Sequence, residues 1–276
     1  MITQRTILAT LLVGLAFVAA TPALAQLAEQ VPPPRLTWSF AGPFGKYDEA
    51  QLQRGLKIYR EVCSNCHSMN LVSFRNLADV GGLGFSEAQA AQIASEYKIK
   101  DLDDKGQPIE RPGRPADHFP APFPNELAAK ATYGVAPPDM STLAKARTYL
   151  RGFPWFLFDI VTQYQEQGPD YIAAILKGYK NPPKGFELPS GGNYNEYFPG
   201  HNIAMPPPLS DGQVKYDDGS PETLEQYSKD VAAFLEWAAE PHMMARKRIG
   251  FQVMIYLIVL SGLLYFTKKK VWSAVH

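Results

Sequence analysis

The cysteines of this chain lie at two positions only, both within the pentapeptide Cys63-Ser64-Asn65-Cys66-His67. The spacing C-x-x-C-H is the attachment signature of a c-type haem. Two intervening residues let both thiols add to the vinyl groups on one edge of the porphyrin, while the adjacent imidazole lies beneath the iron. The pattern predicts covalent haem links from Cys63 and Cys66 and an axial iron ligand at His67.

Three other interpretations of the two cysteines are weaker. A thioredoxin-like redox pair needs a βαβ context, and no such pattern is visible. A structural zinc site usually takes four ligands, so scattered histidines would have to complete it. A disulfide between Cys63 and Cys66 would close too short a loop to constrain the unfolded chain much.

A haem iron bound by His67 has one further axial position. Met69 is too close to His67 to reach the opposite face of the ring, and several other candidates lie in or beside the C-terminal apolar stretch. The remaining candidates are His118, Met140, His201 and Met205. Met205 is favoured because three prolines follow it and stiffen its loop, and because a thioether raises the reduction potential. His201 remains the main rival, since bis-histidine haems are common.

The haem propionates need cationic or hydrogen-bonding partners. Arg147 and Tyr171, which follow a Pro-Pro-Asp turn, could serve. Spacing alone does not separate them from three other arginines, at positions 75, 111 and 114.

The two ends of the chain predict export and anchoring. A lone Arg5, an apolar run over 7–20 and the sequence Ala23-Leu24-Ala25 fit a signal peptide cleaved after residue 25. A second apolar stretch over 249–266 is uncharged and long enough to span a membrane. We therefore expect a signal peptide at 1–25, a periplasmic haem domain at 26–245, a transmembrane anchor with its basic flank at 246–267 and a cytoplasmic tail at 268–276. This arrangement predicts a single-pass protein of the bacterial cytoplasmic (inner) membrane.

The overall charge balance conceals a strongly acidic domain. The whole chain has 27 basic and 27 acidic residues. Region 26–245 contains 20 of the basic residues and all 27 acidic ones, so its formal charge is −7. Such a field would steer a basic partner and raise its association rate at low salt, although it could equally serve only solubility.

Proline and glycine clusters separate short helical patterns, which predicts a mainly α, loop-rich domain. The segment 48–62 places Leu52, Leu56 and Tyr59 on the side that leads to Cys63, and we expect this face to rest against the porphyrin. A second helix is expected over 221–239, with Ser220 as N-cap and Pro221 at its first position. Shorter helices are predicted over 87–97, 125–132, 141–149 and 170–178.

An ordered series of motifs resembles the cytochrome c1 family. It begins with Cys-Ser-Asn-Cys-His-Ser-Met at 63–69 and continues with Arg-Pro-Gly at 111–113, Pro-Phe-Pro-Asn at 122–125 and Ala-Pro-Pro-Asp-Met-Ser at 136–141. Tyr-Phe-Pro-Gly at 197–200, Ala-Met-Pro-Pro-Pro at 204–208, Asp-Asp-Gly at 217–219 and Trp-Ala-Ala-Glu-Pro at 237–241 follow in the family's order. The resemblance covers nearly all of the chain beyond the predicted signal peptide.

The resemblance implies a cytochrome c-type haem domain with long loop insertions, one C-terminal transmembrane helix and one covalently bound haem c. It implies that Cys63 and Cys66 bind the haem, that His67 and Met205 ligate the iron, and that Arg147 and Tyr171 contact a propionate. The Tyr171 match is less secure because it crosses an insertion over 148–170. The apolar run at 153–158 in this insertion is expected to pack over the haem edge or to line a subunit interface.

The family's role is electron transfer within the cytochrome bc1 complex, the quinol–cytochrome c reductase, in which quinol oxidation drives proton translocation. The implied partners are cytochrome b, the Rieske iron–sulfur protein as electron donor, a soluble basic cytochrome c as acceptor and the lipid membrane; no nucleic acid is involved. Two alternatives stay open: a membrane-anchored monohaem cytochrome that works alone, and a haem-based gas sensor with an open iron position.

Overall fold

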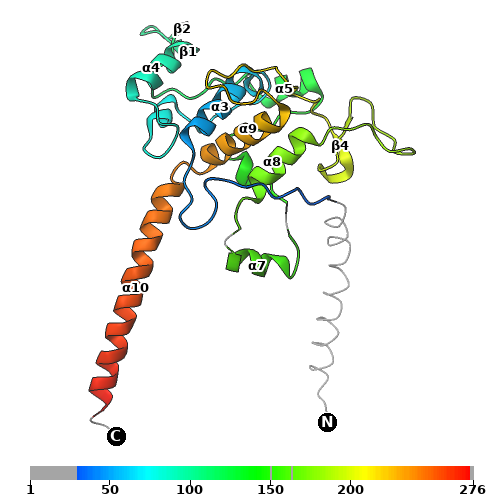
Figure 1. The fold of residues 1–276 in the computed structure, drawn as a ribbon. Coiled ribbons are helices and arrows are strands. Elements are labelled where there is room, and N and C mark those ends of the chain that lie inside the picture. Colours follow the sequence, from blue (N-terminus) through cyan, green and yellow to red (C-terminus); the bar gives the residue numbers. More distant parts are fainter. Residues whose placement is uncertain (1–29, 150, 163, 274–276) are drawn as a thin grey trace, which may run out of the picture.

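The computed structural model describes residues 30–149, 151–162 and 164–273. The chain forms a mainly helical domain, from which one long C-terminal helix projects (Figure 1). The predicted signal peptide at 1–25 lies outside the described residues. The mainly α class is confirmed, since the described strands form only two small antiparallel pairs.

Two helices from opposite ends of the domain form its centre. Helix α3 spans Glu49–Glu61 and α9 spans Leu224–Ala239. They approach closely at Gly55, where a Cβ would lie 2.3 Å from the carbonyl oxygen of Asp230. The buried Asp230 carboxylate accepts hydrogen bonds from Arg54 Nε at 2.8 Å and from Tyr216 Oη at 2.9 Å. Close backbone packing and a buried ion pair therefore hold α3 against α9.

The apolar face predicted for α3 is buried, but not against a porphyrin. Leu52, Leu56 and Tyr59 lie in the main hydrophobic core, which also contains Phe234 of α9. The Tyr59 and Phe234 rings are 5.9 Å apart. Protein side chains therefore cover Leu52, Leu56 and Tyr59, which leaves these three residues little surface for haem contact.

The start of α9 corrects the prediction. Thr223, rather than Ser220, is the N-cap, and its hydroxyl accepts from Gln226 N at 3.3 Å. Ser220 instead donates from its backbone and its hydroxyl to Asp218. Because this local turn occupies Ser220, Pro221 and Glu222 precede the helix.

The smaller elements surround this pair of helices. Helix α4 spans Glu87–Ser95, α5 Glu126–Tyr133 and α8 Gln167–Lys177, close to their predicted bounds. Helix α6 spans only Leu143–Ala146, shorter than the expected 141–149, because Arg147 turns to an extended conformation as its C-cap. The short 3-10 helices are η2 over Cys63–Asn65, η3 over Phe74–Ala78 and η4 over Pro199–His201.

A β-hairpin follows α4 and was not predicted. Strand β1 (Lys98–Leu102) pairs with β2 (Pro108–Pro112), and β3 (Asn193–Tyr194) pairs with β4 (Asn202–Ile203) near η4. Asp103 closes the first hairpin by accepting from Lys105 N and Gln107 N, both at 2.8 Å. Gly106 supplies the positive φ that the turn requires.

The C-terminal helix α10 spans Met243–Trp272 and extends past both ends of the predicted anchor. It is long and apolar enough to cross a membrane, and most of its length projects away from the domain (Figure 1). Its base is tied to the domain by Lys247, whose Nζ donates to the carbonyl oxygens of Phe40 at 2.6 Å and Gly42 at 2.7 Å.

Helix α7 (Trp155–Thr162) lies in the predicted insertion and stands apart from the core. None of the aromatic side chains at 153–158 belongs to the clusters that contain Cys63 or Met205. These side chains are exposed, so both expected roles, over the haem edge or at a subunit interface, stay predictions.

Candidate haem site

The end of α3 folds the Cys-x-x-Cys-His segment into a compact turn. In η2, both Cys66 N and His67 N donate to the carbonyl oxygen of Cys63, at 3.1 Å and 2.9 Å. This turn keeps Cys63, Cys66 and His67 together in one tight backbone loop. Cys63 is buried in the main core, whereas Cys66 is partly exposed.

The His67 side chain is held by a distant backbone group. Its Nδ1 lies 2.8 Å from the carbonyl oxygen of Pro138, and the residue is 8% exposed. Burial lowers the pKa of His67, so the ring is held neutral. A neutral ring that donates from Nδ1 presents the lone pair of Nε2, which is the form that binds a metal.

The loop that supplies Pro138 is fixed by Asp139. One carboxylate oxygen accepts from Ser68 Oγ at 2.8 Å and from Asn70 N at 2.9 Å, and the other accepts from Ser141 N at 2.8 Å. These bonds join the segment that follows His67 to the loop that contains Pro138.

The other interpretations of the cysteines gain no support from their surroundings. Both thiols are free. Burial raises the pKa of the Cys63 thiol to about 12, whereas redox-active Cys-x-x-Cys pairs have a lowered thiol pKa. Across the described ranges, no group of three or more His, Cys, Asp or Glu side chains is placed to hold a metal ion such as zinc.

A second, smaller cluster holds Met205. Its buried members are Tyr171, Ile175 and Ile203, and Met205 packs against them. Tyr179 Oη donates to the Met205 carbonyl oxygen at 3.1 Å, which fixes the backbone of the Met205 loop. The structure therefore brings together two of the predicted site residues, Met205 and Tyr171, from distant parts of the sequence.

The other candidate sixth ligands lie in surroundings of their own, although an Nδ1 contact leaves Nε2 of a histidine available, as it does in His67. The His201 ring stacks on Tyr194, with centroids 5.5 Å apart, and its Nδ1 contacts the carbonyl oxygen of Asn195. The His118 Nδ1 contacts the carbonyl oxygen of Asn70. Met140 is buried in the same core cluster as Cys63, and its backbone nitrogen donates to the Ser68 carbonyl oxygen, on the His67 side of the site.

Arg147 and Tyr171 approach each other across the insertion. Burial raises the pKa of the Tyr171 phenol to about 12, and the positive charge of Arg147 opposes this by favouring the ionised form. Gly168 permits this approach, because a Cβ there would lie 1.7 Å from the carbonyl oxygen of Ala144 in α6. The insertion thus separates in sequence two helices, α6 and α8, that pack closely at Ala144 and Gly168.

Helix α8 joins the two halves of the site. Its Ile172 and Ala173 belong to the core cluster that contains Cys63, while Tyr171 and Ile175 belong to the cluster with Met205. The set of donors fits a c-type haem: two free thiols, a neutral imidazole with Nε2 available, and a thioether in an apolar surrounding.

Backbone groups are the part of the site that the sequence analysis missed. No side-chain pattern marks the Pro138 carbonyl as the partner of His67. The Asp139 bonds could have been suspected, because an Asp after two prolines favours a turn that accepts nearby backbone N–H groups.

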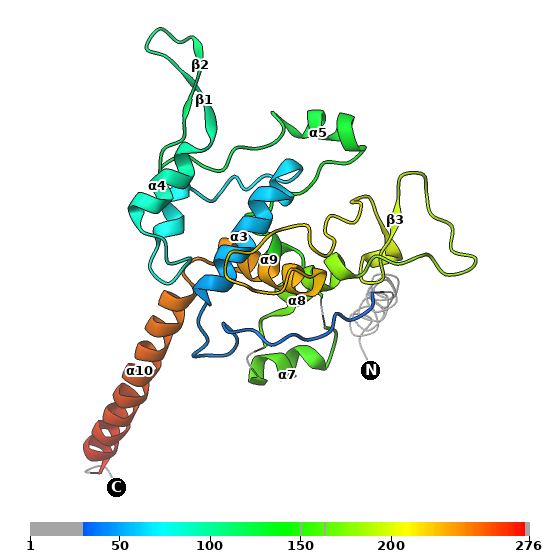
Figure 2. The same cartoon turned by 45° about the horizontal axis from the view of Figure 1, so that its top comes forward.

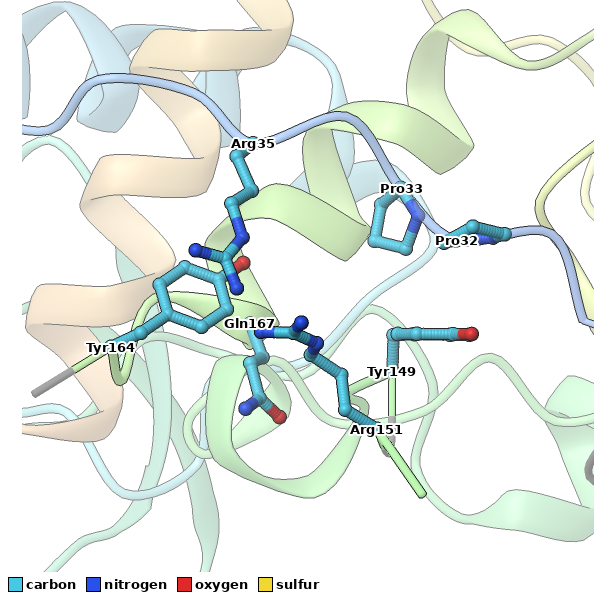
Figure 3. Close-up of a pocket in the computed structure, with 7 residues that line it drawn as sticks. All are labelled: Pro32, Pro33, Arg35, Tyr149, Arg151, Tyr164 and Gln167. Atoms are coloured by element: carbon cyan, nitrogen blue, oxygen red, sulfur yellow. The ribbon is translucent and has the colours of Figure 1, made fainter. Parts of the chain in front are cut away.

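One surface cavity lies near the insertion, and another lies beside the Met205 loop. One, of about 160 Å³, is lined by Arg35, Arg151 and Tyr164, with further residues from the N-terminal segment and the insertion (Figure 3). The other lies around Tyr179 and Pro207. Neither is lined by any of the six predicted site residues.

Comparison with known proteins identifies relatives along most of the chain. Residues 38–275 match the Cytochrome C1 family. The chain is 50% identical over 242 residues to cytochrome c1 of Blastochloris viridis, covering 87% of this chain and 86% of that protein. It is 41% identical over 245 residues to the mitochondrial cytochrome c1 haem protein of Saccharomyces cerevisiae, covering 88% of this chain and 72% of that protein.

A third relative is a longer protein. The chain is 63% identical over 247 residues to cytochrome b/c1 of Bradyrhizobium diazoefficiens, covering 88% of this chain. The matched region makes up only 36% of that protein, so this chain spans about a third of its length.

Proposed function

The chain belongs to the cytochrome c1 family, and we propose that it accepts an electron from a Rieske iron–sulfur protein and passes it to a soluble cytochrome c. This step would occur within the cytochrome bc1 complex, whose quinol oxidation is coupled to proton translocation. The observation that carries the proposal is the buried His67, its Nδ1 occupied by Pro138, beside two free thiols.

Each site residue takes one role in this proposal. Cys63 and Cys66 would hold one haem c covalently, His67 Nε2 and Met205 Sδ would ligate its iron, and Arg147 and Tyr171 would contact a propionate. When bound, the haem supplies a one-electron Fe(III)/Fe(II) couple. The proximity of Arg147 to Tyr171 and of Tyr171 to Met205 supports this assignment.

The protein groups set the reduction potential through the ligands. The Pro138 carbonyl fixes the tautomer and orientation of His67. A thioether at Met205 would favour the reduced iron and raise the potential. The fixed Asp139 and Tyr179 contacts keep both ligand loops rigid, which limits structural change during electron transfer.

The C-terminal helix would anchor the haem domain to the bacterial cytoplasmic membrane in a single pass, with the domain on the periplasmic side. The length and apolar character of α10 support this placement. Lys247 fixes the domain to the base of that helix. The orientation rests on the signal peptide expected at 1–25.

Cytochrome b is the proposed membrane partner, and a basic cytochrome c is the proposed soluble acceptor. The domain's excess of acidic residues supports the second assignment. Several surface carboxylates have partners within the domain: Asp101 pairs with Arg111, Asp217 with Lys57 and Asp218 with Arg54. The field of the whole domain, rather than one acidic run, is therefore the proposed source of attraction.

Purification from native membranes in mild detergent tests the subunit assignment. We expect the chain to co-purify with a b-type cytochrome and a Rieske protein, and the mixture to reduce cytochrome c with quinol. Isolation of the haem-loaded chain alone, still active as an electron carrier, would instead favour the stand-alone membrane-anchored cytochrome that donates to a periplasmic reductase or oxidase.

A further inference from the structure

Helix α7 has the reverse of the usual distribution of side chains. Five large apolar residues in its first turn or just before it are between 46% and 80% exposed: Phe153, Trp155, Phe156, Leu157 and Phe158. Its one charged residue, Asp159, is only 7% exposed. A surface helix of a soluble protein places its charged side chains outward and its aromatic side chains inward. The reversed arrangement in α7 indicates that its outer face contacts an apolar environment.

The Asp159 contacts fix this orientation. Its carboxylate accepts from Arg151, from Gln167 Nε2 at 3.2 Å and from Arg35 at 3.4 Å. Figure 3 shows the Arg35 and Arg151 side chains pointing toward each other from opposite sides of the cavity, with Gln167 beside Arg151. Breaking a buried ion pair is costly, so α7 cannot easily rotate to bury its aromatic side chains.

The exposed helix lies on the side of the domain that faces the membrane anchor. In Figures 1 and 2, α7 lies below the core helices, on the side from which α10 leaves. Phe44, 72% exposed, packs edge-on against Phe251 near the start of α10, with ring centroids 5.5 Å apart. An aromatic contact thus marks where this side of the domain meets the apolar part of α10.

The spread of the exposed side chains favours lipid over a protein partner. Successive helical residues point about 100° apart, so residues 155–158 project in four directions around the helix. A flat protein surface would cover one of these directions, whereas acyl chains and headgroups pack around side chains on several sides of a helix at their boundary. Trp and Phe also favour the boundary between headgroups and acyl chains.

We propose that α7 is an interfacial membrane helix, whose aromatic side chains enter the headgroup–acyl boundary of the phospholipid bilayer that α10 spans. The domain then has two membrane contacts, one at the base of α10 and one at α7. Two contacts fix the tilt of the domain above the bilayer, which a single helix would leave free. This inference does not depend on which proteins exchange electrons with the chain.

Spin-label accessibility tests the proposal on the full haem-loaded chain, purified with any accompanying subunits and reconstituted into phosphatidylcholine vesicles. Leu157→Cys carries a nitroxide on α7, and Phe153→Cys provides a second site if the first variant folds poorly. Leu257→Cys in α10 is the lipid control, because Leu257 and Leu157 are 46% and 47% exposed. Leu127→Cys on α5, 77% exposed and away from α10, is the water control.

Collisions with oxygen and with a water-soluble nickel chelate distinguish the outcomes. We expect the ratio of oxygen to nickel accessibility at 157 to resemble that at 257 and to exceed that at 127 severalfold. A ratio like that at 127 would mean that α7 lies in water and would overturn the proposal. Protection from both reagents would show that a protein subunit covers α7, and it would overturn the proposal equally. The parent chain, labelled in parallel, gives the background from Cys63 and Cys66.

Discussion

His67 Nδ1 lies 2.8 Å from the carbonyl oxygen of Pro138, a residue 71 positions further along the chain. The contact fixes the tautomer of the imidazole and points Nε2 away from the Pro138 loop. It also places Met140, which follows this loop, on the same side of the site as His67. The ligand proposed for the other iron position, Met205, packs against Tyr171 in a separate cluster.

Replacing Met205 by Leu tests that ligand directly, because it removes the thioether at nearly constant volume. We expect loss of the low-spin haem spectrum and a fall in reduction potential on the order of 0.1 V, since a thioether stabilises Fe(II). Optical spectra and a redox titration of the purified protein provide the measurement.

His201→Asn is the matched control for this variant. His201 has a φ of 58°, a conformation that asparagine tolerates, and its ring is already stacked on Tyr194. The control should keep the low-spin spectrum. An unchanged spectrum in Met205→Leu, or its loss in His201→Asn, would return His201 to consideration.

The sequence predicted the helices well wherever local signals determined them. Asp48 caps α3, and its buried face follows the apolar spacing. The start of α9 was misplaced because Ser220, a good N-cap by type, is engaged by Asp218 in a preceding turn. Competition between two local hydrogen-bonding patterns cannot be decided from residue types alone.

Within the candidate site, too, the sequence predicted some features and could not predict others. Cysteine spacing and a proline-stiffened methionine mark the predicted haem ligands, and the structure adds the surroundings that hold them. The Pro138 contact depends on a backbone carbonyl, which every residue carries, so no side-chain pattern could reveal it. The approach of Arg147 to Tyr171 depends on how α6 meets α8, which is a tertiary property.

Acid should destabilise the domain partly through Asp117. Arg111 donates two hydrogen bonds to its carboxylate, at 2.6 Å and 2.9 Å, and holds the pKa of Asp117 at about 2. A depressed pKa adds stability that is complete above the unfolded value of about 3.9 and is lost as the pH falls toward about 2.

Asp117→Asn should therefore lower the thermal midpoint at neutral pH, and the difference from the parent should shrink as the pH falls below about 4. Thermal unfolding across this range, followed by circular dichroism, provides the measurement. Asp104→Asn in the exposed hairpin turn is the control, and its curve should follow the parent throughout. A constant gap between Asp117→Asn and the parent at every pH would remove Asp117 from the acid response.

Electron transfer to a basic cytochrome c should slow as salt rises. Region 26–245 has a formal charge of −7, and its attraction is screened beyond about 8 Å at physiological ionic strength. We expect the bimolecular rate constant to fall by at least about tenfold between low and high salt. Stopped-flow mixing of the reduced protein with the oxidised partner gives this rate, and an acidic cytochrome c should show no such fall. A salt-independent rate with the basic partner would exclude electrostatic steering.

The contact between α6 and α8 leads to the last prediction, in which one added methyl group should disturb the site from a distance. Gly168→Ala would place a Cβ 1.7 Å from the Ala144 carbonyl oxygen, so α8 must move away from α6. Overpacking of this kind costs about 1–3 kcal/mol, measurable by denaturant unfolding. The movement should also separate Tyr171 from Arg147 and alter the cluster that holds Met205.

Gly152→Ala is the matched control, because Gly152 lies in the same insertion and has no atom within 4 Å of the added Cβ. This variant should change neither the stability nor the haem spectrum. The two variants add the same methyl group, so a difference between them isolates the helix contact. We expect Gly168→Ala to shift the reduction potential as well as the unfolding midpoint, because α8 connects the Cys63 and Met205 clusters. Loss of stability with an unchanged potential would show that α8 supports the fold without positioning the ligands.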